Sequence, residues 1–185
     1  MILSRFYFGP IVHFFSQETE HTFIFDARTL DEEGKSFTTL TDKNGKPFRN
    51  VRSIIEDKKG NIWLAGQDGL WRYNGHTFAN LNQNFVGYIH QDNKGSIWTS
   101  AELPANETQK LSDLNGKSLP NGKAWTLSRY DSKTLSDEKP AVSEVWSGEG
   151  MIFGILATHD GKIWFGTTNG VLVYDARLAD KQGKM

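Results

Sequence analysis

The chain has no cysteine among its 185 residues, so disulfide bonds, thiolate metal sites and cysteine nucleophiles are excluded. No apolar run approaches the roughly 20 residues that a membrane-spanning helix needs. An excess of one charge is also missing, because 21 basic residues stand against 22 acidic ones. Proteins that bind nucleic acid by neutralising phosphates usually carry a basic excess or a basic stripe. We therefore expect neither a membrane span in this chain nor a nucleic-acid partner.

Helical periodicity is weak throughout, whereas aromatic residues make up 12% of the chain and glycine occurs 18 times. This composition favours β-strands joined by turns. The N-terminal stretch "MILSRFYFGPIVHFF" has an arginine before apolar residues, as secretory signals do, but Gly9-Pro10 and His13 interrupt it and no small-residue cleavage site follows. We expect one or two strands with a Gly-Pro turn there, and the stretch leaves the compartment undetermined.

The main feature of the sequence is an internal repeat with three copies. "VRSIIEDKKGNIW" begins at Val51, "VGYIHQDNKGSIW" at Val86 and "THDGKIWFGTTNGVLVYD" at Thr158. Each copy predicts a strand, a tight glycine turn, a second strand opened by Ile-Trp, another turn and further strands. A four-stranded antiparallel meander repeated in this way is the unit of a β-propeller blade.

The number of blades is low for a closed ring. Near the N-terminus, "FIFDA" and "SFTTLT" resemble the last strands of a blade, which suggests that the chain begins partway through one, and the last copy lacks a clear fourth strand. We expect an all-β fold in one domain over residues 1–185, a propeller or partial propeller of about three to four four-stranded antiparallel blades. Closure by mixing N- and C-terminal strands, completion by self-association and membership of a longer parent chain all stay open.

The stretch "IIEDKKGNIWLAGQDGLWRYNG" resembles the two-component regulator propeller repeat, found in the periplasmic sensor portions of bacterial hybrid histidine kinases. The third copy keeps "GKIWFGTTNGVLVYD" but has Thr158 in place of Asp57, and the second departs after "QDNKGSIWTS". The resemblance implies a non-enzymatic sensing module in the periplasm that binds a carbohydrate or another small polymer. It also implies self-association or a missing part of a parent chain, because the chain has no kinase or DNA-binding part.

The second copy is interrupted by the polar residues "AELPANETQKLSDLNGKSLPNG", an expected inserted loop over 101–122 within the second complete blade. Insertions in repeat proteins lie in surface loops, often on the binding face. The loop is expected to be either an inert surface excursion or a loop that contacts a ligand or partner.

Few residues are candidates for catalysis or metal binding. Asp57, Asp92 and Asp160 adjoin turn glycines, and such aspartates usually accept hydrogen bonds from turn amides. The histidines show no compact metal-ligand spacing; they are His13, His21, His76, His90 and His159.

The six tryptophans fall into two groups, three that recur at one place in the repeat and three, Trp71, Trp125 and Trp146, that do not follow that register as neatly. Trp63, Trp98 and Trp164 recur at one place in the repeat and are expected to pack between blades. Trp125 and Trp146 flank irregular segments and are candidates for stacking on a sugar ring.

Three hypotheses for function stay open. The first is the non-enzymatic sensing or interaction module, for which we assign no catalytic, cofactor-binding or metal-ligating residue, expect no cofactor and identify no ligand-binding residue. The second is a propeller-type lyase or glycosidase, which convergence of His90, His159 and carboxylates on one face would favour. The third is a fragment of a longer sensor with no function of its own.

Overall fold

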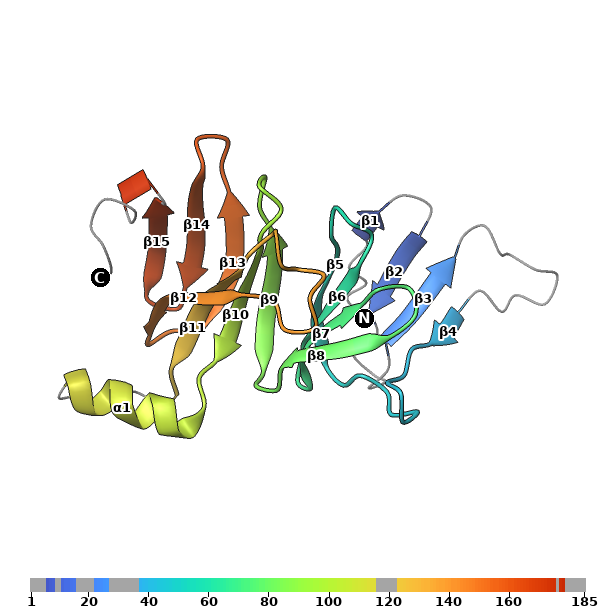
Figure 1. Ribbon diagram of the computed structural model, residues 1–185. Coiled ribbons are helices and arrows are strands. Elements are labelled where there is room, and N and C mark those ends of the chain that lie inside the picture. Colours follow the sequence, from blue (N-terminus) through green and yellow to red (C-terminus); the bar gives the residue numbers. More distant parts are fainter. Residues whose placement is uncertain are drawn as a thin grey trace.

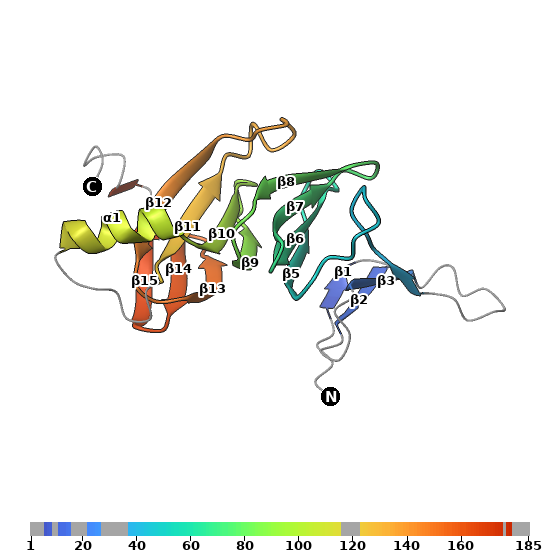
Figure 2. The ribbon, with the colours of Figure 1, turned by 90° about the horizontal axis from the view of Figure 1, so that it is seen from below.

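The computed structural model describes residues 6–8, 11–15, 22–26, 37–115, 123–175 and 177–178. Within these ranges the backbone forms four antiparallel sheets, here called blades 1 to 4 in chain order. Figures 1 and 2 show that the blades follow one another along an open arc, with blade 1 and blade 4 at its two ends. The expected all-β partial propeller is confirmed.

The strands of each blade follow the order of the sequence. Blade 1 contains β1 (Phe6–Phe8), β2 (Ile11–Phe15), β3 (Thr22–Asp26) and β4 (Phe37–Thr39). Blade 2 contains β5 (Val51–Glu56), β6 (Ile62–Gly66), β7 (Gly69–Tyr73) and β8 (Phe78–Asn82). Blade 3 contains β9 (Val86–Gln91), β10 (Ile97–Glu102), β11 (Trp125–Tyr130) and β12 (Val142–Gly148). Blade 4 contains β13 (Ile152–Ala157), β14 (Lys162–Thr167) and β15 (Gly170–Asp175).

Blade 1 is complete, which corrects the expectation that the chain begins partway through a blade. The stretch around Gly9-Pro10 forms β1 and β2, as expected, and these strands pair with each other and then with β3. They escape a search for repeats because neither contains the Ile-Trp pair that marks the other copies. Blade 4, in contrast, has three strands within the described residues, in line with the unclear fourth strand of the last copy.

The strand register shows that blades 2, 3 and 4 are equivalent despite the insertion. In each blade, the isoleucine before the repeat tryptophan is paired with a tyrosine of the next strand. The pairs are Ile62 with Tyr73, Ile97 with Tyr130 and Ile163 with Tyr174. Ala101 and Glu102 of the expected 101–122 loop belong to β10, and the insertion beyond them lies in the connection between β10 and β11 without changing the blade.

This connection contains a helix, α1 (Ala105–Asn115), where the sequence indicates only a loop. Pro104 suits the start of a helix because its missing N–H needs no partner there, and its carbonyl accepts from the Thr108 amide at 2.9 Å. Leu111 packs against Leu103 and Ala124 beside the blade. The helix escapes sequence analysis because its remaining surface is polar and its apolar periodicity is faint.

In blade 2, one aspartate joins the first turn to the core. Asp57 Oδ2 accepts from the indole Nε1 of Trp63 at 2.8 Å. Its Oδ1 accepts from the backbone amides of Lys59 and Asn61 at 2.8 and 3.0 Å. Gly60 closes this turn at φ 82°, a left-handed conformation in which glycine has no Cβ penalty. The expected turn-capping role of Asp57 is confirmed, and the same carboxylate satisfies a buried indole.

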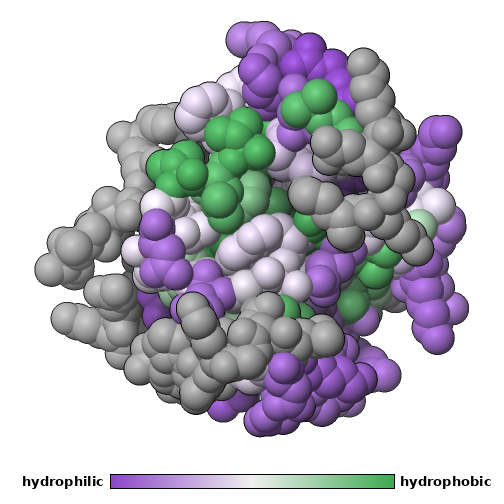
Figure 3. Space-filling view, turned by 90° about the vertical axis from the view of Figure 1, so that its left-hand side faces the viewer, coloured by the Kyte–Doolittle hydropathy of each residue, from purple (hydrophilic) through white to green (hydrophobic). Residues whose placement is uncertain are grey.

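Blade 3 repeats this arrangement and blade 4 does not. Asp92 Oδ2 accepts from Trp98 Nε1 at 2.8 Å. In blade 4 the equivalent position is Thr158, whose hydroxyl donates to the Lys162 carbonyl at 3.1 Å. Trp63 and Trp98 are 0% and 2% exposed, whereas Trp164 is 43% exposed, and Figure 3 shows apolar side chains on this end of the molecule. The expected packing between blades therefore holds for two of the three tryptophans.

The first strand of each following blade covers these tryptophans. Trp63 is buried in one cluster with Val86 and Ile89 of β9. Trp98 is buried in a second cluster with Ile152 and Ile155 of β13. The core therefore lies at two junctions, between blades 2 and 3 and between blades 3 and 4.

His90 adds a polar contact between blades 3 and 4. Its Nε2 accepts from the backbone amide of Ala157 at 3.3 Å, which requires a neutral imidazole with a free lone pair on that nitrogen. Burial lowers the pKa of His90, against the opposing influence of the nearby Asp92 carboxylate.

We predict that Asp57→Ala lowers the free energy of unfolding by about 2–4 kcal/mol, because a buried indole N–H and two turn amides lose their acceptor. Chemical denaturation measures the change. Asp42→Ala is the matched control, since Asp42 accepts from the turn amides of Asn44 and Lys46 at 2.8 and 2.9 Å in exposed bonds without an indole. The control is expected to lose about 1 kcal/mol. Equal losses in the two variants would show that the indole bond contributes nothing.

A second prediction concerns pH. The pKa of His90 is lower in the folded chain than in the unfolded chain, where it is about 6.5, so the unfolded state binds more protons at mildly acidic pH. Stability therefore falls as the pH drops below about 6.5. We expect His90→Gln to show a smaller loss of unfolding free energy between about pH 7.5 and pH 5.5 than the unmodified chain. Parallel pH profiles would contradict a titrating role for His90.

Candidate functional site

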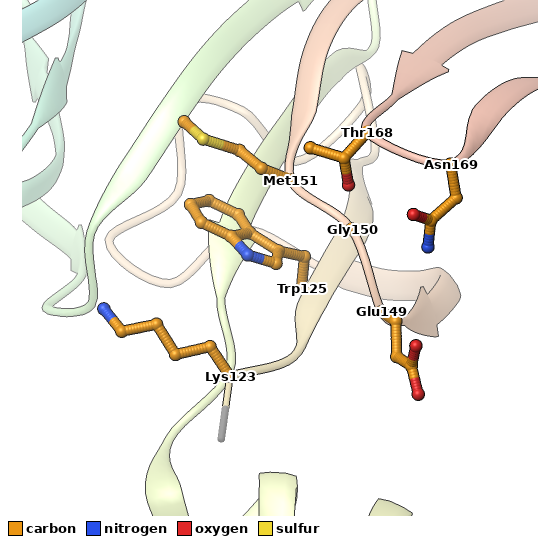
Figure 4. Close-up of a pocket in the computed structure, with 7 residues that line it drawn as sticks. All are labelled: Lys123, Trp125, Glu149, Gly150, Met151, Thr168 and Asn169. Carbon is orange, nitrogen blue, oxygen red and sulfur yellow. The ribbon is translucent and has the colours of Figure 1, made fainter. Parts of the chain in front are cut away.

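A cavity of about 340 Å³ opens at the junction of blades 3 and 4 (Figure 4). Three connections form its wall. Lys123 and Trp125 lie where the inserted segment enters β11, Glu149 to Met151 join β12 to β13, and Thr168 and Asn169 form the turn between β14 and β15. Because β-strands of successive blades bring such connections to the same end of a propeller, residues distant in sequence meet here.

Trp125 supplies a buried donor to this cavity. Its side chain is 8% exposed and packs edge-to-face against Phe85 with ring centroids 5.8 Å apart. Trp63, Trp71 and Trp98 each donate their indole N–H to a protein oxygen, whereas the Trp125 N–H has no acceptor within the described residues. In Figure 4 its nitrogen lies on the ring edge turned toward the side from which Lys123 enters. A buried N–H without a partner is costly, so a ligand acceptor would stabilise it.

The charges at the cavity are unequally neutralised. Lys123 Nζ forms an ion pair with Glu102 Oε1 at 3.0 Å. Glu149, which is half-buried, forms no ion pair among the residues that the structure describes. Glu149 therefore offers two acceptor oxygens, and the exposed Thr168 and Asn169 add a hydroxyl and an amide that both donate and accept.

Blade 2 shows how the same position is filled elsewhere in the fold. Asp68 Oδ1 accepts from Arg49 Nη2 at 2.7 Å, and its Oδ2 accepts from the Arg49 backbone amide at 2.8 Å. Phe48 is 3% exposed and packs edge-to-face against Trp71. Only about 10 Å³ of space remains here.

Blade 4 has other residues at the positions of Phe48, Arg49 and Asp68, which fill this space in blade 2. The pairings of Val51 with Gly66 and of Ile152 with Thr167 are equivalent, so Gly150 takes the place of Arg49 and Asn169 that of Asp68. Gly150 has φ 98°, and a Cβ there would lie 2.7 Å from the Thr168 hydroxyl oxygen. A residue with a side chain at position 150 would therefore require Thr168 to shift. The loss of the arginine–aspartate pair and of the phenylalanine leaves the cavity open.

Of the residues singled out in the sequence, Trp125 reaches the cavity and Trp146 does not. Trp146 packs against the core of the blade 3–blade 4 junction, with its ring centroid 6.0 Å from that of Phe165. The repeat pattern does not indicate Glu149, Thr168 and Asn169 as cavity residues, because at these positions the third copy differs from the first instead of matching it. The replacement of Arg49 and Asp68 was a signal available in the sequence.

The two histidines considered for catalysis lie at the opposite end of blades 3 and 4. His90 accepts a hydrogen bond from the Ala157 backbone amide, and the exposed His159 lies in the turn that follows β13. The nearby carboxylates are engaged, since Asp92 binds Trp98 and Asp160 forms an ion pair with Lys162 at 2.8 Å. His13 and His21 fall in ranges whose side chains lie outside the described residues.

Within the described ranges, no group of three or more His, Asp or Glu side chains is arranged to hold a metal ion. No helix of that part of the chain is long and apolar enough to cross a membrane.

Comparison with solved structures shows which fold this is. The extracellular domain of a protein described as a one-component system from B. thetaiotaomicron is 18% identical with a TM-score of 0.65, and the match covers 92% of this chain and 20% of that one. The extracellular domain of a hybrid two-component system from the same organism is 19% identical with a TM-score of 0.55, covering 89% and 18%. PorZ, a surface component of the type-IX secretion system of Porphyromonas gingivalis, is 17% identical with a TM-score of 0.55, covering 95% and 25%.

At these identities the likeness establishes the fold alone, and the chain spans about a fifth of the length of the first two structures. No curated protein matches the chain significantly. Residues 45–68 and 147–169 match the two-component regulator propeller family, and these segments contain the first turns of blades 2 and 4. The chain therefore carries two segments that match this repeat family, and its described residues fold as a partial propeller of four blades.

Proposed function

We propose that the chain is a non-enzymatic, ligand-sensing section of a longer receptor of the two-component type. The observation that carries the proposal is the cavity at the blade 3–blade 4 junction, which is open where its blade 2 counterpart is plugged. The similarity to extracellular domains of one-component and hybrid two-component systems supports a sensor-like module. The membrane span and the output part would then belong to the parent chain, and the module would lie in the periplasm.

The ligand class that fits the cavity is an oligosaccharide. Sugar hydroxyls both donate and accept hydrogen bonds, and the cavity offers acceptors at Glu149 and donors at Trp125 and Asn169. Its volume of about 340 Å³ falls at the small end of the usual range for ligand pockets, about 300–1,000 Å³. One or two sugar units of a longer polymer would occupy it, while the rest would cross the exposed turn at Thr168.

The alternative of a propeller-type lyase or glycosidase receives no support from a particular arrangement of residues. His90 and His159 lie away from the cavity, and Asp57 and Asp92 are held by their turns and tryptophans. A binding role needs none of these groups.

Isothermal titration calorimetry with maltohexaose, xylohexaose and a chondroitin hexasaccharide tests the proposal. We expect one of these probes to bind, and Glu149→Gln combined with Asn169→Ala to weaken that binding about tenfold or more, since hydrogen bonds to charged groups contribute about 1.5–3 kcal/mol. Glu144→Gln is the matched control, because Glu144 is exposed on β12 and does not line the cavity.

Binding that survives the double variant unchanged would place the ligand elsewhere on the module. Absence of binding by all three probes to a chain that melts cooperatively would overturn the oligosaccharide proposal.

A further inference from the structure

Blade 4 exposes an apolar face at the end of the arc. The strand register places Leu156, Trp164 and Val173 side by side across β13, β14 and β15, and Val171 lies on the same face two residues before Val173. We call these four residues the blade-4 outer face. Their exposed fractions are 59%, 43%, 46% and 65% in the order Leu156, Trp164, Val173 and Val171. Figure 3 looks onto this end and shows apolar side chains gathered on it.

The equivalent faces of blades 2 and 3 are covered within the chain. Trp63 and Trp98 occupy the position of Trp164 and are almost fully buried. In the first case β9 packs against β5 and β6, and in the second β13 packs against β9 and β10. The covering element is therefore the first strand of the next blade both times.

Both covering strands have the same apolar spacing. Buried branched side chains stand three residues apart, at Val86 and Ile89 in β9 and at Ile152 and Ile155 in β13. The blade-4 outer face continues this series of interfaces, so the element complementary to it is another strand of this kind. A repeat that ends a stack normally has a polar outer face, and this face is apolar.

The blade-4 outer face also differs from its counterparts in a way that specifies its partner. Arg72 and Arg129 lie beside the repeat tryptophans of blades 2 and 3, where blade 4 has Val173. Thr158 replaces the aspartate that accepts the indole N–H in the other blades. The Trp164 N–H consequently has no acceptor in the described part of the chain, and a covering element that buries it must bring one.

We propose that the blade-4 outer face binds the first strand of a further propeller blade, one with branched apolar residues three positions apart and with an acceptor for the Trp164 indole. This blade lies outside the four blades described here. The proposal is independent of the ligand-binding function, because the cavity opens at the strand ends and not on this face.

The test extends the full chain after Met185 with a second copy of residues 83–148, which contain a first strand of the required kind. Hydrogen exchange followed by mass spectrometry reports on β13 to β15 separately from the rest. We expect exchange in residues 152–175 to slow about tenfold or more in the extended chain, because the added blade must open before these strands do.

Two controls separate docking from an unspecific effect of added length. In one, the copy's counterparts of Val86 and Ile89 are replaced by aspartate; in the other, the extension is unchanged and Trp164→Glu is introduced. Both are expected to restore the exchange rate of the chain without an extension. Unchanged exchange in the extended chain, or slowing that persists in both controls, would overturn the proposal.

Light scattering on the unextended chain tests the competing occupant, a second copy. We expect a mass near 20.9 kDa at micromolar concentration. A discrete dimer that Trp164→Glu converts to monomer would show that the face pairs with itself, and the proposal of a further blade would be wrong.

Discussion

The packing of blades 2, 3 and 4 depends on the burial of one tryptophan from each of blades 2 and 3 against the first strand of the next blade. Trp63 and Trp98 are large enough to fill the space between two twisted sheets, and almost no part of either remains exposed. Their indole N–H groups would be left without water in that space, and a buried donor without an acceptor is costly. Asp57 and Asp92 remove this cost while they shape the turn that precedes the tryptophan. One carboxylate thus couples local turn geometry to packing between blades.

This coupling explains why substitutions in one copy of the repeat have local and separable effects. In blade 4, Thr158 stands where the other copies have aspartate, and the tryptophan beside it lies on an uncovered face. At the other end of the same blade, Gly150 and Asn169 replace an arginine–aspartate pair, and a cavity opens. The strands between these two ends keep their pairing. Hydrogen bonds between the strand backbones maintain the sheet. The residues of the turns and of the outer face can therefore differ between copies of the repeat.

The cavity and the blade-4 outer face suit different kinds of partner. The cavity combines a buried indole, a carboxylate that has no ion pair within the described ranges and polar turn residues, a mixture typical of sites for small polar ligands. The outer face is apolar, and it continues the series of interfaces between blades 2 and 3 and between blades 3 and 4. A module of this kind can bind a ligand at the strand ends while its sheets stack along a longer array.

The amino-acid sequence by itself determined the blade. Alternating apolar residues, glycine turns and the Ile-Trp pair are local signals, and they were sufficient for the strands of the repeated copies and for the turn role of Asp57. The strands of blade 1 were expected but its completeness was not, because β1 and β2 lack the Ile-Trp pair of the repeat. The helix α1 was not expected, because it has no strongly periodic apolar pattern. Only the tertiary structure decided which tryptophans are covered and where Trp125 meets Glu149 and Asn169. These are contacts between distant segments, and they depend on how each blade is placed against the next, which no local pattern specifies.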